Sequence, residues 1–124
     1  GEPKGFHFPD RRNNRLYVAT SGKVWAVEDT GAALNPYWPA EPSLVDPSVV
    51  LHHPGTDDIY VGVRDYGGTA AVVKLDAASG NYVSHVSLES GPVTIGPPSL
   101  DLGPPGMLHM GSVAGILYAV ELGF

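Results

Sequence analysis

Short apolar runs separated by polar, glycine-containing turns dominate the chain. Residues 16–31 read LYVATSGKVWAVEDTG, in which two runs of β-branched, aromatic and small apolar residues flank a Ser-Gly turn. This pattern is typical of a β-hairpin followed by an exit turn. Similar stretches begin at Ile59 (IYVGVRDYGGTAAVVKLDAASG) and at Leu108 (LHMGSVAGILYAVELG), 43 and 49 residues after the preceding start. That spacing predicts a repeated unit of several strands.

The repeats predict a single all-β domain over residues 1–124, with almost no helix because no long apolar stripe has a helical period. The approximate repeats span 5–46, 47–93 and 94–124. Strands are expected at 5–9, 15–20, 23–29 and 36–38, then at 48–53, 59–64, 70–76 and 81–88, and finally at 98–102 with a hairpin over 107–122. The third repeat reaches Phe124 without an outer strand. We therefore expect three consecutive antiparallel blades of propeller type, a partial propeller; a compact β-sandwich of the same hairpins is the alternative.

The hairpin strands are apolar at nearly every position and do not alternate. A sheet with one wet face alternates, so continuous apolar runs predict that both faces are covered by neighbouring sheets. Ala19, Gly62 and Gly111 fall at the same place in the three repeats. A small residue at that place would let adjacent sheets approach closely.

Composition narrows the possible chemistry. The chain has 16 Gly, 12 Pro and no Cys, which excludes disulfides, thiolate nucleophiles and zinc–cysteine sites. No apolar run approaches the roughly 18 residues of a membrane span, so none is expected. No Gly-x-Ser-x-Gly elbow and no paired nucleophile and base are present, so we predict no catalytic residue.

Charge is distributed unevenly along the chain. The first 23 residues hold five basic and two acidic residues, about +3, which leaves about −9 for the rest of a net charge of −6. Arg11 and Arg12 are interpreted as part of a solvated turn. They are not read as a nucleic-acid site, because interleaved aromatic residues are missing and the acidic remainder would repel a polyanion. The asymmetry favours contact between a basic first repeat and an acidic surface of another copy or a partner.

One constellation is a candidate ligand site. Aligning the inner strands places His7, His52 and Asp101 at one position of the three repeats. In a propeller such positions face a shared channel, where two imidazoles and a carboxylate would suit a small polar ligand or a divalent cation. The alternative is a polar, wet channel that binds nothing in particular, and we assign neither a metal nor a cofactor. The Asp57-Asp58 pair lacks the ligand spacing of a calcium loop.

Other residues are candidates for contact with a partner. Tyr37 and Trp38 form an aromatic pair in a proline-rich stretch, and exposed aromatic residues often anchor interfaces. Arg11 and Arg12 supply positive charge. Phe124 stands beside the edge that the expected third repeat leaves open.

Residues 24–38, VWAVEDTGAALNPYW, resemble the repeat of the quinoprotein-type (PQQ-like) β-propellers, which runs Ala-x-Asp, a Thr-Gly turn and a Trp. The second repeat matches in KLDAASG with Val83 where the family has Trp, and the third matches in YAVELGF. The resemblance implies four-stranded blades in proteins that are often periplasmic or extracellular. Some members are quinone-dependent dehydrogenases and others are scaffolds without a cofactor.

Propellers close with four to eight blades, so about three blades are expected to be completed by another polypeptide. The leading hypothesis is a non-enzymatic structural or interaction module of a secreted, periplasmic or cell-surface assembly, such as a filament or envelope complex. Its partner would be another copy or a separate chain, acting through open β edges. The alternatives are a fragment of a quinone-dependent dehydrogenase and a half-propeller that binds a ligand or glycan.

Overall fold

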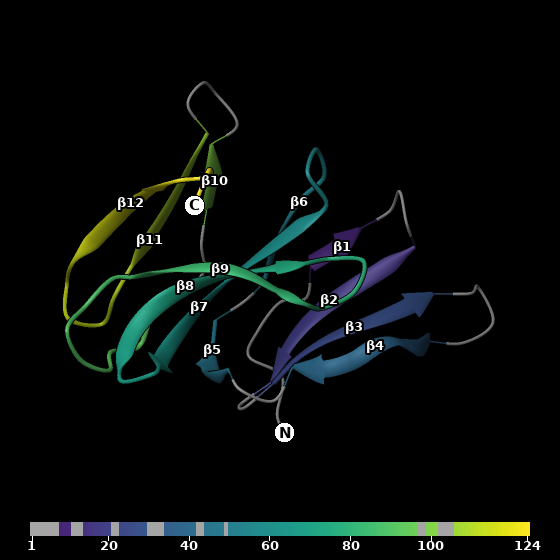
Figure 1. The fold of residues 1–124 in the computed structure, drawn as a ribbon, viewed down its shortest axis with the longest axis horizontal. Coiled ribbons are helices and arrows are strands. Elements are labelled where there is room, and N and C mark those ends of the chain that lie inside the picture. Colours follow the sequence, from purple (N-terminus) through teal and green to yellow (C-terminus); the bar gives the residue numbers. More distant parts are fainter. Residues whose placement is uncertain are drawn as a thin grey trace.

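The computed structural model describes residues 8–10, 14–20, 23–29, 34–41, 44–48, 50–96, 99–101 and 106–124. The strands β1 and β4 and residues 20, 29, 45 and 46 are described as backbone alone. In this part of the chain every regular element is a strand, so the protein is all-β as the sequence predicts. The strands form three antiparallel sheets that follow one another along the chain (Figure 1).

The first sheet has the order β1 (Phe8–Asp10), β2 (Arg15–Thr20), β3 (Lys23–Asp29) and β4 (Leu34–Glu41). The bounds of β2 and β3 agree with the sequence prediction. β4 is longer than the expected outer strand at 36–38 and contains Pro36 and Pro39. Both prolines are tolerated because β4 pairs on one side only, with β3, among the described residues.

The second sheet is built on β7 (Asp58–Tyr66), β8 (Thr69–Asp76) and β9 (Tyr82–Ser87). Its inner edge is divided between β5 (Val45–Pro47) and β6 (Leu51–His53), which both pair with β7. The expected continuous strand at 48–53 is therefore wrong. At the break, the Ser48 amide donates to the Gly62 carbonyl and the Gly62 amide donates to Ser48 Oγ, at 2.7 and 2.8 Å.

The third sheet has the order β10 (Ser99–Asp101), β11 (Met107–Gly111) and β12 (Leu117–Glu121). A bridge between Ile95 and Ser112 lies on the same edge as β10. Pro47, the last residue of β5, and Leu51, the first residue of β6, have the same spacing as Ile95 and Ser99 in the third repeat. The described inner-edge residues of these two repeats thus pair with their hairpins at corresponding places.

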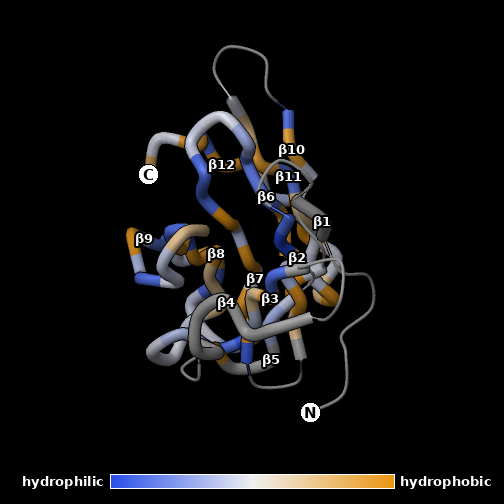
Figure 2. Tube along the Cα trace, turned by 90° about the vertical axis from the view of Figure 1, so that its right-hand side faces the viewer, coloured by the Kyte–Doolittle hydropathy of each residue, from blue (hydrophilic) through white to orange (hydrophobic). Residues whose placement is uncertain are grey.

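The second sheet lies between the other two, with an apolar cluster on each side. The cluster toward the first sheet includes Tyr17, Val24, Ile59, Val61 and Val73. The cluster toward the third includes Tyr60, Val72, Leu108 and Met110. Figure 2 shows hydrophobic positions along β7 in the middle of the molecule. Residues 59–63 of β7 and 70–75 of β8 are all buried, which confirms the prediction that both faces of this hairpin are covered.

Candidate functional site

The pairing register makes the three hairpins comparable residue by residue. Leu16 pairs with Val27 in the first sheet, Ile59 with Leu75 in the second and Leu108 with Val120 in the third. Because directly opposed residues point to the same side of a sheet and neighbours alternate, each hairpin has two faces that can be matched between sheets.

We call one of them the front face. It carries Leu16, Val18, Trp25 and Val27 in the first sheet, Ile59, Val61, Val73 and Leu75 in the second, and Leu108, Met110, Tyr118 and Val120 in the third. The opposite, back face carries Tyr17, Ala19, Val24 and Ala26, then Tyr60, Gly62, Val72 and Lys74, then His109, Gly111, Leu117 and Ala119.

The three sheets all stack in the same direction, back face on front face. The back face of the first sheet packs on the front face of the second, and the back face of the second packs on the front face of the third. The same kind of contact is therefore made twice within the chain. Among the described residues, the front face of the first sheet and the back face of the third face no other sheet.

Residues at matched positions are buried on the back faces of the first and second sheets but exposed on the back face of the third. Val24 and Val72 are both 0% exposed, whereas Leu117, at the same position of the third sheet, is 77% exposed. Ala26 and Lys74 are buried, whereas Ala119 is exposed. The open back face of the third sheet is thus apolar where its equivalents form the core.

The surroundings of two matched glycines agree with this contrast. A Cβ added at Gly62 would lie 2.6 Å from Ile95 Cγ2, so the sheets meet closely there. A Cβ added at Gly111 would meet only the Ile116 carbonyl oxygen of its own hairpin, at 3.7 Å. The predicted role of a small residue in close approach is confirmed at Gly62, and Gly111 marks the corresponding place on an uncovered face.

Further groups border these open faces. Beside Leu117, the connection between β11 and β12 exposes Val113 and Ile116. At the other end of the third sheet, Asp101 and Glu121 are exposed on the back face, on either side of Met107. A cation–π contact lies on the open front face of the first sheet. There Lys23 Nζ is 5.6 Å from the centre of the Trp25 ring. The apolar residues beside it on this face, Leu16, Val18 and Val27, are partly exposed.

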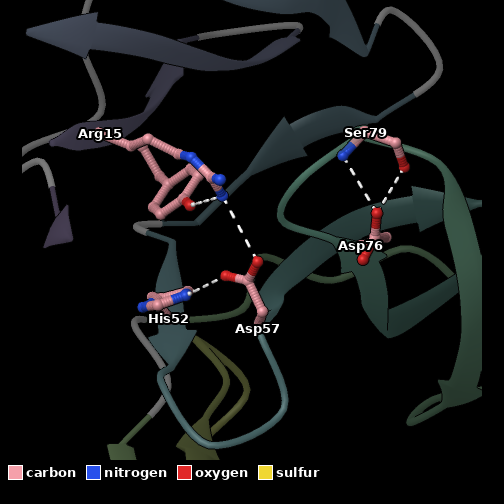
Figure 3. A network of polar contacts seen from close by, with 6 residues as sticks. Arg15, His52, Asp57, Asp76 and Ser79 are labelled. Atoms are coloured by element: carbon pink, nitrogen blue, oxygen red, sulfur yellow. Dashed lines mark hydrogen bonds and ion pairs between the residues drawn. The ribbon is translucent and has the colours of Figure 1, made fainter. Parts of the chain in front are cut away.

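A polar network joins the first sheet to the second (Figure 3). Asp57, in the turn before β7, holds Oδ1 2.9 Å from His52 Nε2 and accepts a hydrogen bond from Arg15 Nη1 on Oδ2 at 3.4 Å. The His52 ring is buried and stacks on Tyr17, with centroids 5.3 Å apart. A buried polar ring needs such a partner, so the network stabilises the contact between the two sheets.

Replacing Asp57 by Asn removes the charge while keeping the shape. Asp57 has a φ of 54°, a conformation that Asn also tolerates. We expect Asp57→Asn to lower the free energy of unfolding by about 1 kcal/mol, because the ion pair with Arg15 is lost and the hydrogen bond with His52 weakens. Chemical denaturation would measure it, with Asp65→Asn as control, since the Asp65 carboxylate accepts an exposed hydrogen bond from the Gly68 amide of its own hairpin. Equal losses in both variants would contradict the network's role.

A second network joins the second sheet to the third. Buried Lys74 donates from Nζ to the main-chain oxygens of Leu122, at 2.8 Å, and Phe124. The same Nζ lies 5.6 Å from the centre of the Tyr60 ring and 4.5 Å from that of the Phe124 ring. Burial lowers the pKa of Lys74, against the opposing charge of Asp58. Burial, and next the charge of Asp58, raise the pKa of Tyr60 to about 12.

The raised pKa of Tyr60 predicts an alkaline loss of stability. The pKa of Tyr60 is near 10.0 in the unfolded chain. The contribution of Tyr60 to the free energy of unfolding is therefore complete below pH 10 and is lost as the pH rises toward 12. We expect the wild type to lose about 2 kcal/mol more than Tyr60→Phe across this interval, at about 1.4 kcal/mol per pKa unit. Lys74 acts in the opposite direction below 10.5, because its lowered pKa makes stability rise with pH, and it is present in both proteins. Urea titrations at several alkaline pH values would measure the difference, and parallel profiles would contradict it.

The structure does not bring the predicted ligand residues together. His7 lies outside the described residues. His52 pairs with Ile59, and the residue at the matching position of the third sheet is Leu100, paired with Leu108. Asp101 is one position further, opposite Met107, and therefore on the other face of its sheet. The predicted equivalence of His52 and Asp101 is wrong, and ligand binding by this set stays a prediction.

The predicted partner contacts are placed only in part. Arg11 and Arg12 lie outside the described residues, and the side chains of Tyr37 and Trp38 do as well. The Phe124 ring packs within the chain, 5.9 Å from the Tyr60 ring between centroids. Sequence reasoning missed Leu117 and Lys74. The repeat alignment contains the signal for Leu117, because it matches Val24 and Val72 in the two covered hairpins.

In the described part of the chain no three His, Cys, Asp or Glu side chains are grouped so that they could hold a metal ion. Nor does that part contain a helix with the length and apolar character needed to cross a bilayer. No protein-family model matches the chain, and no curated protein is significantly similar to it.

Proposed function

We propose that this protein is a non-enzymatic structural and interaction module of a secreted or cell-surface assembly, such as a filament or an envelope complex. In this function, another polypeptide covers its open faces and edges, either another copy or a partner chain. The carrying observation is the exposure of Leu117 at a position where Val24 and Val72 are fully buried. Exposed apolar surface of this kind is typical of sites that bind other proteins.

The open edge of the third sheet supports the same proposal. In the described residues β12 pairs only with β11, and its sequence, LYAVE, contains no proline to prevent further pairing. An unpaired edge presents free amide and carbonyl groups to another strand. By contrast, β4 at the other end of the stack carries two prolines. Strand addition is therefore expected at β12 and not at β4.

A location outside the cytoplasm rests on the resemblance to quinoprotein-type β-propeller repeats, whose members are often periplasmic or extracellular. The same resemblance supports interpreting the three stacked sheets as successive blades.

Light scattering after size-exclusion chromatography, combined with the binding of the apolar dye ANS, tests the proposal. We expect the isolated chain to associate as its concentration rises, or to bind ANS while it is monomeric. Leu117→Glu is expected to reduce whichever of the two is observed, because it places a charge on the open face. A folded monomer that leaves ANS fluorescence unchanged would contradict the proposed function.

A further inference from the structure

We propose that the open back face of the third sheet binds the open front face of the first sheet in a second copy of this chain. The contact between copies would continue the back-to-front stacking that the three sheets already show within the chain. This inference rests on the proposed function and names its partner: the chain itself, joined head to tail.

The internal contacts supply the geometric argument. The chain twice places a back face on the front face of the next hairpin, at matched registers. Among the described residues the stack leaves one front face and one back face uncovered, which are the two halves of a third contact of the same kind. A second copy supplies the missing half at each end. Such an interface is heterologous, so it builds a ring if the rotation closes and a filament if it does not.

The side chains on the two open faces are compatible. The back face of the third sheet offers His109, Leu117 and Ala119, and at Gly111 an added Cβ would meet nothing closer than 3.7 Å. At Gly62, the equivalent place in the closed contact, Ile95 occupies the space in front of the glycine. The front face of the first sheet offers the larger side chains of Leu16, Val18, Trp25 and Val27, all partly exposed. The large side chains of the front face can thus pack against Ala119 and into the space at Gly111, as interdigitating packing requires.

Charge favours the same orientation. Asp101 and Glu121 lie at the end of the third sheet nearest the connection from β10 to β11. The matching connection of the first sheet, from β1 to β2, contains Arg11 and Arg12 in its sequence. Stacking in the internal direction brings this end of the third sheet to the end of the first sheet at which β2 begins. At the corresponding end of the closed contact, Arg15 of the first sheet already bonds to Asp57 of the second across the two sheets.

Cross-linking of single-cysteine variants tests the inference, because the chain has no cysteine of its own. Val27→Cys marks the open front face and Ala119→Cys marks the open back face. With a short bis-maleimide, an equimolar mixture of the two is expected to give cross-linked dimers, while each variant alone gives almost none. Ser90→Cys, an exposed position outside both faces, replaces either partner as the control.

Charge variants provide a second measurement on folded protein. Leu117→Glu is expected to weaken association and mixed cross-linking about tenfold, while melting temperature in dilute solution stays unchanged because Leu117 is exposed. Arg11→Glu with Arg12→Glu is expected to weaken association, and adding Asp101→Lys with Glu121→Lys is expected to restore it.

The possible failures are distinguishable. Cross-linking of Ala119→Cys with itself would show back faces paired by two-fold symmetry and would overturn the head-to-tail inference while leaving the proposed function intact. Association in light scattering that Leu117→Glu does not weaken would also overturn the head-to-tail inference alone. A chain that stays monomeric and folded without binding ANS would overturn both.

Discussion

A Leu108→Ala variant is expected to lose about 2–5 kcal/mol of its free energy of unfolding, whereas Leu117→Ala is expected to change it by less than about 0.5 kcal/mol. The two leucines belong to the same sheet, on neighbouring strands. Leu108 is 0% exposed and belongs to the apolar cluster between the second and third sheets. Leu117 is 77% exposed on the opposite face. Truncating the first leaves a cavity, and truncating the second leaves only solvent.

Urea denaturation at low protein concentration would measure both changes, so that association does not contribute. The pair forms its own control, because the same atoms are removed from one sheet at two levels of burial. Similar losses in the two variants would mean that the back face of the third sheet is already covered within the chain. That result would remove the basis for an open face.

The hairpins could be predicted from the sequence because their information is local. Runs such as LYVAT and KVWAVED combine β-branched and aromatic residues with a Ser-Gly turn, which fixes strands and register together. The observed bounds of β2 and β3 accordingly match those expected. The stacking on both faces of the second sheet was also foreseeable, because IYVGV and AAVVKL leave no polar face.

The inner edges were harder because tertiary hydrogen bonds define them. The break between β5 and β6 depends on the double contact of Ser48 with Gly62, a residue of another strand. Nothing in the sequence of residues 48–53 predicts that contact. Likewise, Pro36 and Pro39 argue against a strand when the chain is considered alone, but the edge position of β4 removes the objection.

The predicted equivalence of His52 and Asp101 was wrong for a related reason. The inner strand of the third repeat follows that of the second by 48 residues, from Leu51 to Ser99, whereas the hairpins are offset by 49, from Ile59 to Leu108. Aligning both at one offset displaces Asp101 by a single residue. Because side chains alternate along a strand, that displacement transfers Asp101 to the opposite face. Sequence similarity within a repeat therefore locates strands more reliably than it locates faces.

Gly62→Val is expected to lower the free energy of unfolding by about 3 kcal/mol, while Gly111→Val stays within about 0.5 kcal/mol of the wild type. At Gly62 the first added carbon already lies 2.6 Å from Ile95 Cγ2 and 3.1 Å from Ser48 Oγ, and burial on both sides leaves no direction for relief. At the matched Gly111 the added side chain points from an uncovered face. Valine also favours strands over glycine, which offsets small costs there.

Thermal and urea denaturation of the two variants at low protein concentration would test this contrast. Adding Ile95→Ala to Gly62→Val is expected to recover about 1 kcal/mol, because it removes the nearest obstructing carbon. The coupling between these two changes separates steric conflict at the sheet contact from a general effect of losing glycine. If Gly111→Val were as destabilising as Gly62→Val, the two glycines would have the same surroundings, and the third sheet would have no open back face on which another copy could stack.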